Sequence, residues 1–196
     1  MAPKIFYWGI KARAQLAVLI GQFATDGFEW EQSPDWPGMK PETPFGQLPY
    51  LVDGDVKIAQ SNAIARYLAR KYNLQGESDA DFGLSESLIE EQSDLLTLVF
   101  TANYSDNKEE AYNKVFSETY PKQLEYLENL LQNDFFTTEL TAGSLAIFSA
   151  FNIALDLESS LLDKFPKLKA FYDRVAALPQ IKGYLDQNIP AYVKRS

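Results

Sequence analysis

The spacing of apolar and polar residues predicts an α/β first half. The aromatic and β-branched run Ile5–Trp8, which Gly9 stops, predicts a strand. Residues 12–23 then carry apolar side chains at helical spacing, and residues 28–31 alternate as in a half-buried strand. We therefore expect two parallel strands joined by a helix.

A proline-rich segment and a hairpin follow. Residues 33–46 contain four prolines, which predicts an irregular, exposed segment. Two alternating runs, 49–52 and 55–59, flank an Asp-Gly pair, which is typical of a β-hairpin. Ser61 stands where an N-cap residue would begin the next helix. This order predicts a four-stranded mixed sheet with helices packed on it.

The second half shows helical spacing and no strand pattern. Its apolar residues predict four helices, within 84–100, 112–131, 145–155 and 165–175. Pro121 is expected to kink the second of them. The predicted fold class is therefore α/β plus all-α, with an α/β domain at 1–75, a connector at 75–82 and an all-helical bundle at 82–196.

Composition limits the chemistry that this fold could carry. The chain of 196 residues contains no cysteine and no histidine. This excludes disulfides, Cys or His metal clusters, and Cys–His or Ser–His–Asp nucleophiles, so catalysis must come from Tyr, Ser, Thr, Lys, Arg or carboxylates. Because the sequence has neither a run of 18 apolar residues nor the layout of a signal peptide, we expect a cytoplasmic protein without membrane contact.

Charge is distributed unevenly along the chain. The net charge is −9 at pH 7, which disfavours binding to nucleic acid. Residues 1–76 carry a net charge of +1 and residues 77–196 a net charge of −10. The contrast indicates that two units meet near residue 76, and that the first could receive an anionic ligand without long-range repulsion.

Three stretches together resemble one family. They are Y-W-G-I-K-A-R-A from residue 7, then W-P-G-M-K-P-E-T-P-F-G-Q-L-P followed by the hairpin and Q-S-N-A-I-A-R-Y-L, and L-L-D-K-F-P-K-L-K-A-F-Y-D-R-V-A-A-L-P from residue 161. Over nearly its full length the chain resembles the cytosolic glutathione transferases, most closely the sigma class. The resemblance implies a thioredoxin-like N-terminal domain that binds glutathione as co-substrate, without a metal. It also implies an all-helical C-terminal domain that forms an electrophile pocket and homodimer contacts.

Tyr7 is the residue expected to carry the chemistry. A hydrogen bond from its hydroxyl would favour the thiolate of glutathione, whose free thiol has a pKa of about 8.5. The resemblance gives Tyr7 this role and sets Arg13, expected at the start of the first helix, near the sulfur. The alternatives are simple packing for Tyr7 and a surface salt bridge for Arg13. Phe6 and Trp8 are expected on the opposite face of the strand.

A glutathione site must also hold the backbone and both carboxylates of the tripeptide. Gln60 and Ser61 begin a helix, whose free N–H groups suit the γ-glutamyl carboxylate. The resemblance implies that Gln47, Leu48 and Pro49 pair with the cysteinyl unit, and we predict a cis bond before Pro49. Structurally, Ser61 could simply cap its helix, and a proline is tolerated at the start of a strand.

The resemblance supplies the remaining contacts. Trp36 and Lys40 would donate to the glycyl carboxylate. Asp94 would reach across a two-fold dimer to the γ-glutamyl ammonium of the neighbouring subunit. As ordinary surface residues, Lys40 and Asp94 would instead be solvated, and Trp36 could pack on the bundle. Phe45 resembles an aromatic residue that related classes insert between subunits.

The electrophile pocket is expected between the two domains. Its predicted lining is Trp8, Leu98, Thr101 and Tyr104. Because the chain is slightly short, we expect this pocket to be open on its C-terminal side. Ser144 stands where the family has an aspartate three residues after a capping residue, here Thr141, so a weaker helix cap is expected.

Three functions remain open at this point. The first is conjugation of glutathione to hydrophobic electrophiles. The second is a weakly active or structural glutathione-binding protein of the crystallin type, and the third is a glutathione-dependent isomerase of the prostaglandin D synthase type. Retention of Tyr7 together with the other glutathione contacts favours the first. The lack of cysteine excludes a thioredoxin-type reductase.

Overall fold

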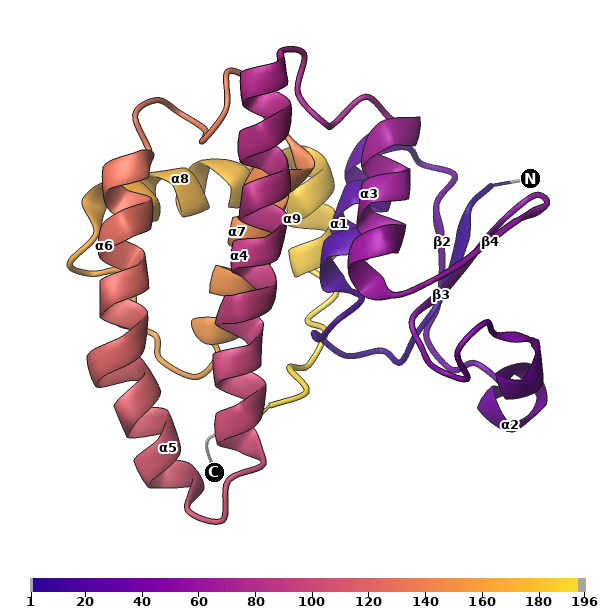
Figure 1. Cartoon of the computed structure of the whole chain (residues 1–196), viewed down its shortest axis with the longest axis horizontal. Helices are drawn as coiled ribbons and strands as arrows, with labels where there is room; N and C mark the ends of the chain where they lie inside the picture. The colour runs from indigo at the N-terminus through magenta and orange to yellow at the C-terminus, as the bar shows by residue number, and fades with distance from the viewer. Residues whose placement is uncertain (1, 194–196) are drawn as a thin grey trace.

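A four-stranded mixed sheet with two helices on it forms the first part of the chain (Figure 1). The structure is a computed structural model that describes residues 2–193. The elements of this part are β1 (Lys4–Phe6), α1 (Gln15–Ala24), β2 (Glu29–Glu31), α2 (Trp36–Met39), β3 (Tyr50–Asp53), β4 (Val56–Ala59) and α3 (Ser61–Lys71). The strand order is β2-β1-β3-β4. β1 runs parallel to β2 and antiparallel to β3, and β3 and β4 form the predicted hairpin.

Buried apolar side chains hold the strands and the first helix together. Ile5 of β1 pairs with Leu51 of β3, and both side chains are completely buried. α1 is buried from Gln15 to Gly21 because it contacts α3 and also two helices of the bundle, α7 (Ala142–Ala154) and α9 (Pro179–Leu185). The first helix is therefore one of the elements that join the first part of the chain to the bundle.

The observed element boundaries correct several expectations. β1 ends at Phe6, so Tyr7 follows the strand, although its N–H still donates to the Glu31 carbonyl at 3.1 Å. α1 begins at Gln15, which leaves Arg13 in the turn before it. Ser61 is the first residue of α3, and Gln60 takes the N-cap position instead.

The proline-rich segment is not wholly irregular. It contains α2 and a 3₁₀ turn over Lys40–Glu42. Asp35 caps α2 by accepting from the Gly38 N–H at 3.4 Å. Pro37 lies in the first turn, where a missing N–H costs no helical hydrogen bond. Prolines therefore start the short helices here rather than prevent them.

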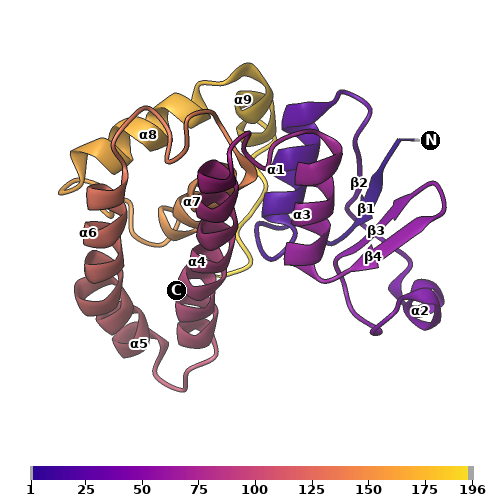
Figure 2. The same cartoon turned by 45° about the horizontal axis from the view of Figure 1, so that its top comes forward.

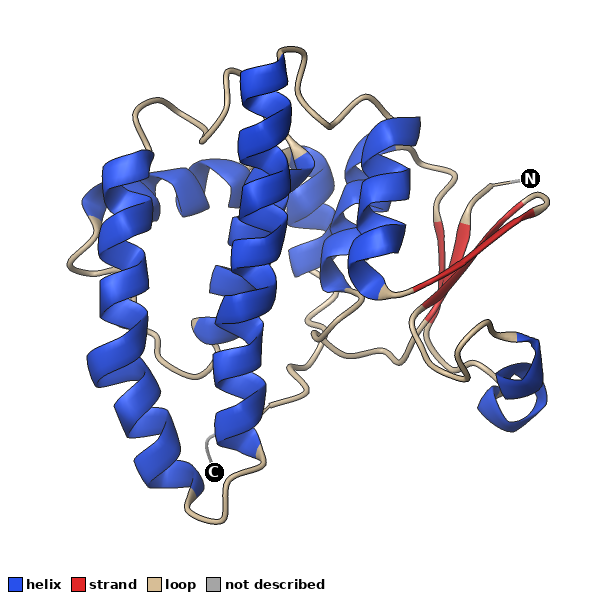
Figure 3. Ribbon diagram, viewed as in Figure 1, coloured by secondary structure: helices blue, strands red, loops and turns tan. Residues whose placement is uncertain are grey.

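Helices make up the regular structure of the second part, as Figure 3 shows. They are α4 (Asp79–Asn103), α5 (Lys108–Lys114), a π-helical turn (Val115–Thr119), α6 (Tyr120–Leu130), α7 (Ala142–Ala154), α8 (Pro166–Ala176) and α9 (Pro179–Leu185). The thioredoxin-like and all-helical fold class predicted from the sequence is thus confirmed, whereas the exact domain limits remain a prediction. The π turn directly precedes α6, where Pro121 cannot donate to a carbonyl of the preceding turn.

Two features of the bundle differ from expectation. α4 begins at Asp79, within the predicted connector, because Ser78 caps it by accepting from the Asp81 N–H at 3.0 Å. α9 has no counterpart among the four predicted helices, and Pro179 stands at its start. α7 lies at the centre of the bundle and is buried along its whole length (Figure 2).

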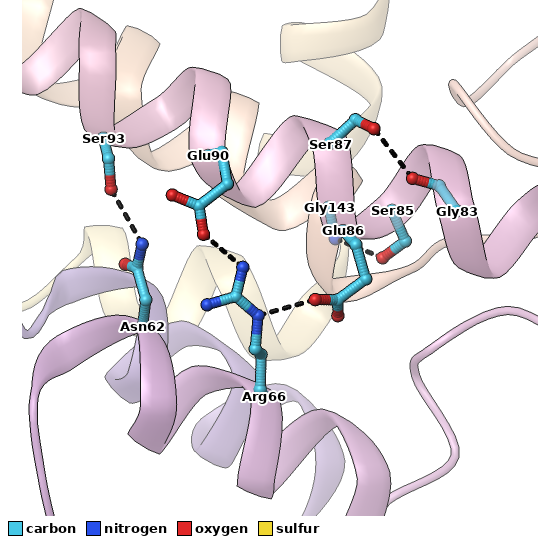
Figure 4. A network of polar contacts seen from close by, with 9 residues as sticks. All are labelled: Asn62, Arg66, Gly83, Ser85, Glu86, Ser87, Glu90, Ser93 and Gly143. Carbon is cyan, nitrogen blue, oxygen red and sulfur yellow. Dashed lines mark hydrogen bonds and ion pairs between the residues drawn. The ribbon is translucent and has the colours of Figure 1, made fainter.

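Polar contacts join the two parts along α3 and α4 (Figure 4). Arg66 of α3 binds Glu86 at 2.6 Å and also Glu90 of α4. One residue before Glu86 on α4, the Ser85 hydroxyl accepts from the Gly143 N–H of α7 at 3.0 Å. A Cβ on Gly143 would stand 2.5 Å from the Ser85 carbonyl oxygen, so glycine is required for this close approach.

No helix among residues 2–193 is both long enough and apolar enough to cross a lipid bilayer.

Candidate functional site

A polar cavity of about 480 Å³ lies beside the end of β1. Four separate segments line it: the turn after β1, α2, the segment before β3, and the start of α3. Its lining residues are Tyr7, Trp8, Arg13, Trp36, Gln47, Leu48, Pro49, Gln60 and Ser61. Eight of these nine were proposed from the sequence for thiol activation or for contacts with the tripeptide. We call this cavity the peptide cleft.

Trp8 is the ninth, and its position corrects a prediction. Strict alternation would point Trp8 away from Tyr7, yet both side chains line the peptide cleft. The alternation does not apply because β1 ends at Phe6 and the chain turns immediately afterwards. Trp8 is 40% exposed, so its ring is available to a ligand.

Tyr7 is the buried polar group of this cleft, with 8% of its surface exposed. Burial raises the pKa of the Tyr7 hydroxyl above its ordinary value, and the backbone hydrogen bond and positive charge of Arg13 offset only part of this rise. The phenol therefore keeps its proton near neutral pH. It can act as a hydrogen-bond donor there and not as a base.

The start of α3 contributes Gln60 and Ser61 to the lining of the cleft. Ser61 and Asn62 open the helix, where N–H groups are free of helical partners and the helix dipole is positive. Gln60 has φ of 76°, a left-handed conformation that costs a non-glycine residue of order 1–3 kcal/mol. Such a conformation is typical of functional sites, and here the residue that adopts it lines the cleft.

Leu48 contributes its backbone to the cleft. The Leu48–Pro49 peptide bond is cis, as predicted. Leu48 lies just before β3 and outside the ladder, and no backbone hydrogen bond to its N–H or C=O occurs within the described part of the chain. An extended peptide could therefore pair with Leu48 as an added strand.

Two residues proposed for glutathione lie outside the peptide cleft. Lys40 is exposed on the 3₁₀ turn after α2 and does not line the cavity. Asp94 is exposed on α4 and does not line the cavity. A role for Asp94 would require a second copy of the chain.

A second cavity, of about 310 Å³, adjoins the peptide cleft. Four residues line both: Tyr7, Trp8, Arg13 and Leu48. The other residues of the second cavity are Ile10, Ala12, Phe100, Tyr104 and Tyr192. We call it the aromatic cavity, because four of its side chains besides Tyr7 carry aromatic rings.

The aromatic cavity only partly matches the predicted electrophile pocket. Trp8 and Tyr104 line it, whereas Leu98 and Thr101 do not. Phe100 of α4 and Tyr104, the C-cap residue that follows the helix, are four positions apart and both line the cavity. Thr101 is exposed and does not line it. Tyr104 is therefore where the prediction placed it, whereas the prediction of Leu98 and Thr101 as lining residues was wrong for this cavity.

The C-terminal segment contributes Tyr192 to the lining of this cavity. Tyr192 packs its ring edge-on against Phe100, with 6.1 Å between centroids, and its hydroxyl contacts that of Tyr104. The Arg13 guanidinium lies 5.5 Å from the centroid of the Phe100 ring. No local sequence signal marked Tyr192 or Phe100, because both reach the cavity only through tertiary folding.

A third cavity, of about 840 Å³, lies on the far side of the bundle between α6 and the residues after α7. It is larger than the peptide cleft but contains none of the residues proposed from the sequence. Size alone therefore does not identify the site. The peptide cleft is the candidate site because a protonated phenol, a helix start and an unpaired backbone segment converge on it.

The helix cap at the start of α7 has the predicted form. The Thr141 hydroxyl accepts from the Ser144 N–H at 3.4 Å. The Ser144 hydroxyl is buried and has no hydrogen-bond partner among the described residues. It therefore does not return a bond to the cap, as a longer acidic side chain could.

Two family models match the chain. Residues 12–70 match the N-terminal domain of glutathione S-transferases, and residues 93–188 match the C-terminal domain of the same proteins. Both halves thus lead to one family.

Individual relatives agree over nearly the full length. A hematopoietic prostaglandin D synthase of Gallus gallus is 31% identical, over 94% of this chain and 95% of its own. A class-mu 26 kDa glutathione S-transferase of Schistosoma mansoni is also 31% identical, over 99% of this chain and 92% of its own. The solved structure of a Pi-class glutathione S-transferase of Onchocerca volvulus superimposes with a TM-score of 0.86 at 30% identity, over 96% of this chain and 94% of that one. The resemblance found in the sequence is confirmed: the chain belongs to the glutathione S-transferase family.

Proposed function

We propose that this protein is a glutathione transferase that ionises the glutathione thiol and directs the thiolate at hydrophobic electrophiles. One observation carries the proposal: Tyr7 stands at the boundary that the peptide cleft shares with the aromatic cavity. A sulfur beside its hydroxyl would face apolar space on one side and peptide-binding groups on the other. This is the arrangement that thiolate transfer to an apolar substrate requires.

Binding of glutathione would use the walls of the peptide cleft. The γ-glutamyl carboxylate would accept hydrogen bonds at the start of α3, from the backbone and from Ser61. The cysteinyl unit would pair with the Leu48 backbone. Trp36 would donate its indole N–H to the glycyl carboxylate, and Lys40 could reach the same group only by extending its long side chain over the rim.

The chemical step needs no protein nucleophile. The Tyr7 hydroxyl would donate a hydrogen bond to the sulfur and stabilise the thiolate after its proton leaves to solvent, while the charge of Arg13 adds positive potential. The thiolate then attacks an electrophilic carbon, a C–S bond forms, and the leaving group departs with the electron pair of its own bond. With an aromatic halide the products are a thioether and a halide ion.

A homodimer would complete the site. Asp94 would approach the γ-glutamyl ammonium bound to the neighbouring subunit. The exposure of Asp94 on α4 and the 64% exposure of Phe45 are compatible with contacts between two copies. In the absence of a dimer, both would remain ordinary surface residues.

The test is a titration of bound glutathione combined with a turnover assay. The ultraviolet absorbance of the thiolate, followed against pH with the protein in excess, should give a thiol pKa below the value of about 8.5 for a free thiol. Turnover of a generic aromatic halide should follow the same titration. Normal binding with an unshifted thiol pKa would favour the structural, crystallin-type alternative and contradict the proposal.

Glutathione-dependent isomerisation is a second candidate. The similarity to a prostaglandin D synthase favours it, and this activity would use the same thiolate. The two candidates differ only in what the aromatic cavity accepts. Formation of prostaglandin D without consumption of glutathione would identify the isomerase, whereas consumption of glutathione by the aromatic halide would identify the transferase.

A further inference from the structure

The last described residues cross the molecule between two cavities. Residues 188–193, which we call the C-terminal strap, follow α9 and run past the turn after β1 (Figure 1). Tyr192 forms part of the aromatic cavity on one side. Residues 188–191 line a different cavity, of about 380 Å³, on the other. The strap is therefore a partition between two spaces.

Lys11 holds this partition in place. Its N–H donates to the Pro190 carbonyl at 2.8 Å, and its own carbonyl accepts from the Tyr192 N–H at 3.1 Å, which makes a parallel bridge opposite Ala191. The Lys11 ammonium forms an ion pair with Asp156, which lies just after α7. Lys11 thus connects the glutathione-binding domain, the strap and the central helix of the bundle.

The cavity of about 380 Å³ beside the strap bears on how the contacts of Lys11 hold the strap. That cavity is lined in part by Asn152 and Tyr184, and the buried hydroxyl of Tyr184 has no hydrogen-bond partner among the described residues. Apolar packing anchors the strap at Ile189, which packs against the hydrophobic core, and at Val193, which is 1% exposed. Between these two residues, the hydrogen bonds of Lys11, whose side chain is held by the ion pair, fix the path of the strap.

We propose that Lys11 and Asp156 are positioning residues that determine how firmly the aromatic cavity holds its substrate, because they seat the strap and thereby place Tyr192 as the outer wall. The proposal rests on the proposed function, since it treats the aromatic cavity as the electrophile site. Neither Lys11 nor Asp156 lines the peptide cleft or the aromatic cavity, so neither touches the reacting atoms. Loosening the strap should therefore weaken contacts to the apolar substituent and spare those to glutathione.

Two ligands separate these effects in calorimetric titrations of the full chain. Glutathione occupies the peptide cleft alone, and S-hexylglutathione adds an apolar chain that would enter the aromatic cavity. Tyr192→Ala should weaken binding of S-hexylglutathione about tenfold and change the affinity for glutathione less than twofold. Lys11→Met and Asp156→Asn should each weaken S-hexylglutathione about three- to fivefold, and Lys11→Arg should restore the parent value.

A matched control and a double mutant complete the design. Lys182→Met removes the exposed ion pair with Asp186 on α9 and should alter neither affinity. If Lys11 acts through Tyr192, adding Lys11→Met to Tyr192→Ala should have no further effect. Asp156→Asn, at a partly exposed carboxylate, serves if Lys11→Met does not fold.

The outcomes distinguish the two proposals. An unchanged ratio of the two affinities in Lys11→Met or Asp156→Asn, or additive losses in the double mutant, would overturn the role of the strap and leave the proposed function standing. A parent protein that binds neither ligand would overturn the proposed function and this inference with it.

Discussion

Replacing Tyr7 by phenylalanine removes one hydroxyl and keeps the ring that fills the buried position after β1. A hydrogen bond to a charged group contributes about 1.5–3 kcal/mol, and one pKa unit corresponds to about 1.4 kcal/mol. The hydroxyl should thus lower the thiol pKa by about one to two units, from about 8.5 to between about 6.5 and 7.5. We expect a lowering of the thiol pKa close to two units, because Tyr7 is 8% exposed and little water competes for the sulfur.

The sign of the change follows from which form is stabilised. Tyr7 keeps its proton, since burial raises its pKa, and so it donates to the thiolate and favours ionisation of the thiol. Tyr7→Phe should therefore raise the thiol pKa of bound glutathione towards its free value. At pH 6.5 the thiolate fraction should fall about ten- to fiftyfold for shifts of one to two units. The conjugation rate should fall less, because a more basic thiolate is also the better nucleophile.

The assay is the absorbance titration of the bound thiolate in the parent and in Tyr7→Phe. Tyr126→Phe is the matched control, because Tyr126 is 70% exposed on α6 and should leave the titration unchanged. Equal midpoints in the parent and in Tyr7→Phe would refute the assignment of the phenol as the donor. An equal loss of glutathione affinity in both charge states of the thiol would likewise refute it.

Three further predictions concern packing, pH and assembly. Gly143→Ala should lower the free energy of unfolding in urea by about 1–3 kcal/mol, because the added Cβ would meet the Ser85 backbone. Gly83→Ala is the control: its Cβ would stand in open space, and the substitution should raise the free energy of unfolding by about 0.5–1 kcal/mol. The reverse order of stability would contradict the close approach of α4 and α7. Burial alone would raise the pKa of Asp53, but hydrogen bonds from a lysine and a tyrosine of α3 outweigh burial and lower that pKa. The ionised Asp53 therefore stabilises the folded state fully above about pH 4, and this stabilisation is lost as the pH falls through the pKa of Asp53 in the folded protein. Asp53→Asn should therefore be less stable than the parent at pH 7 and differ less at pH 3; a difference independent of pH would exclude the charge as its origin. Asp94→Asn should weaken glutathione binding about fivefold, or about 1 kcal/mol, without lowering thermal stability; an unchanged affinity in calorimetry would refute the contact between subunits.

Much of the architecture could be predicted from the chain. Apolar alternation located the β3–β4 hairpin, and helical spacing located α4 and α7. The predictions failed where end effects decide the outcome. Pro37 lies in the first turn of a short helix within the segment predicted to be irregular, and Pro179 starts a helix that was not predicted, because a proline in the first turn loses no hydrogen bond. β1 stops two residues earlier than its aromatic run suggested, and Trp8 lines the cleft.

Local sequence patterns were enough to predict the four strands, the longer helices, the family and the segments that supply the peptide cleft, because those segments carry recognisable patterns at the turn after β1, before β3 and at the start of α3. Tertiary structure alone decided which face of α4 meets Tyr7, and it brought Phe100 and Tyr192 together across the aromatic cavity. The periodicity of a segment shows that one face of its helix or strand is apolar, but it does not show which distant element packs against that face. That choice depends on the relative placement of whole elements, here fixed by α1 between the sheet and the bundle and by Lys11 on the C-terminal strap.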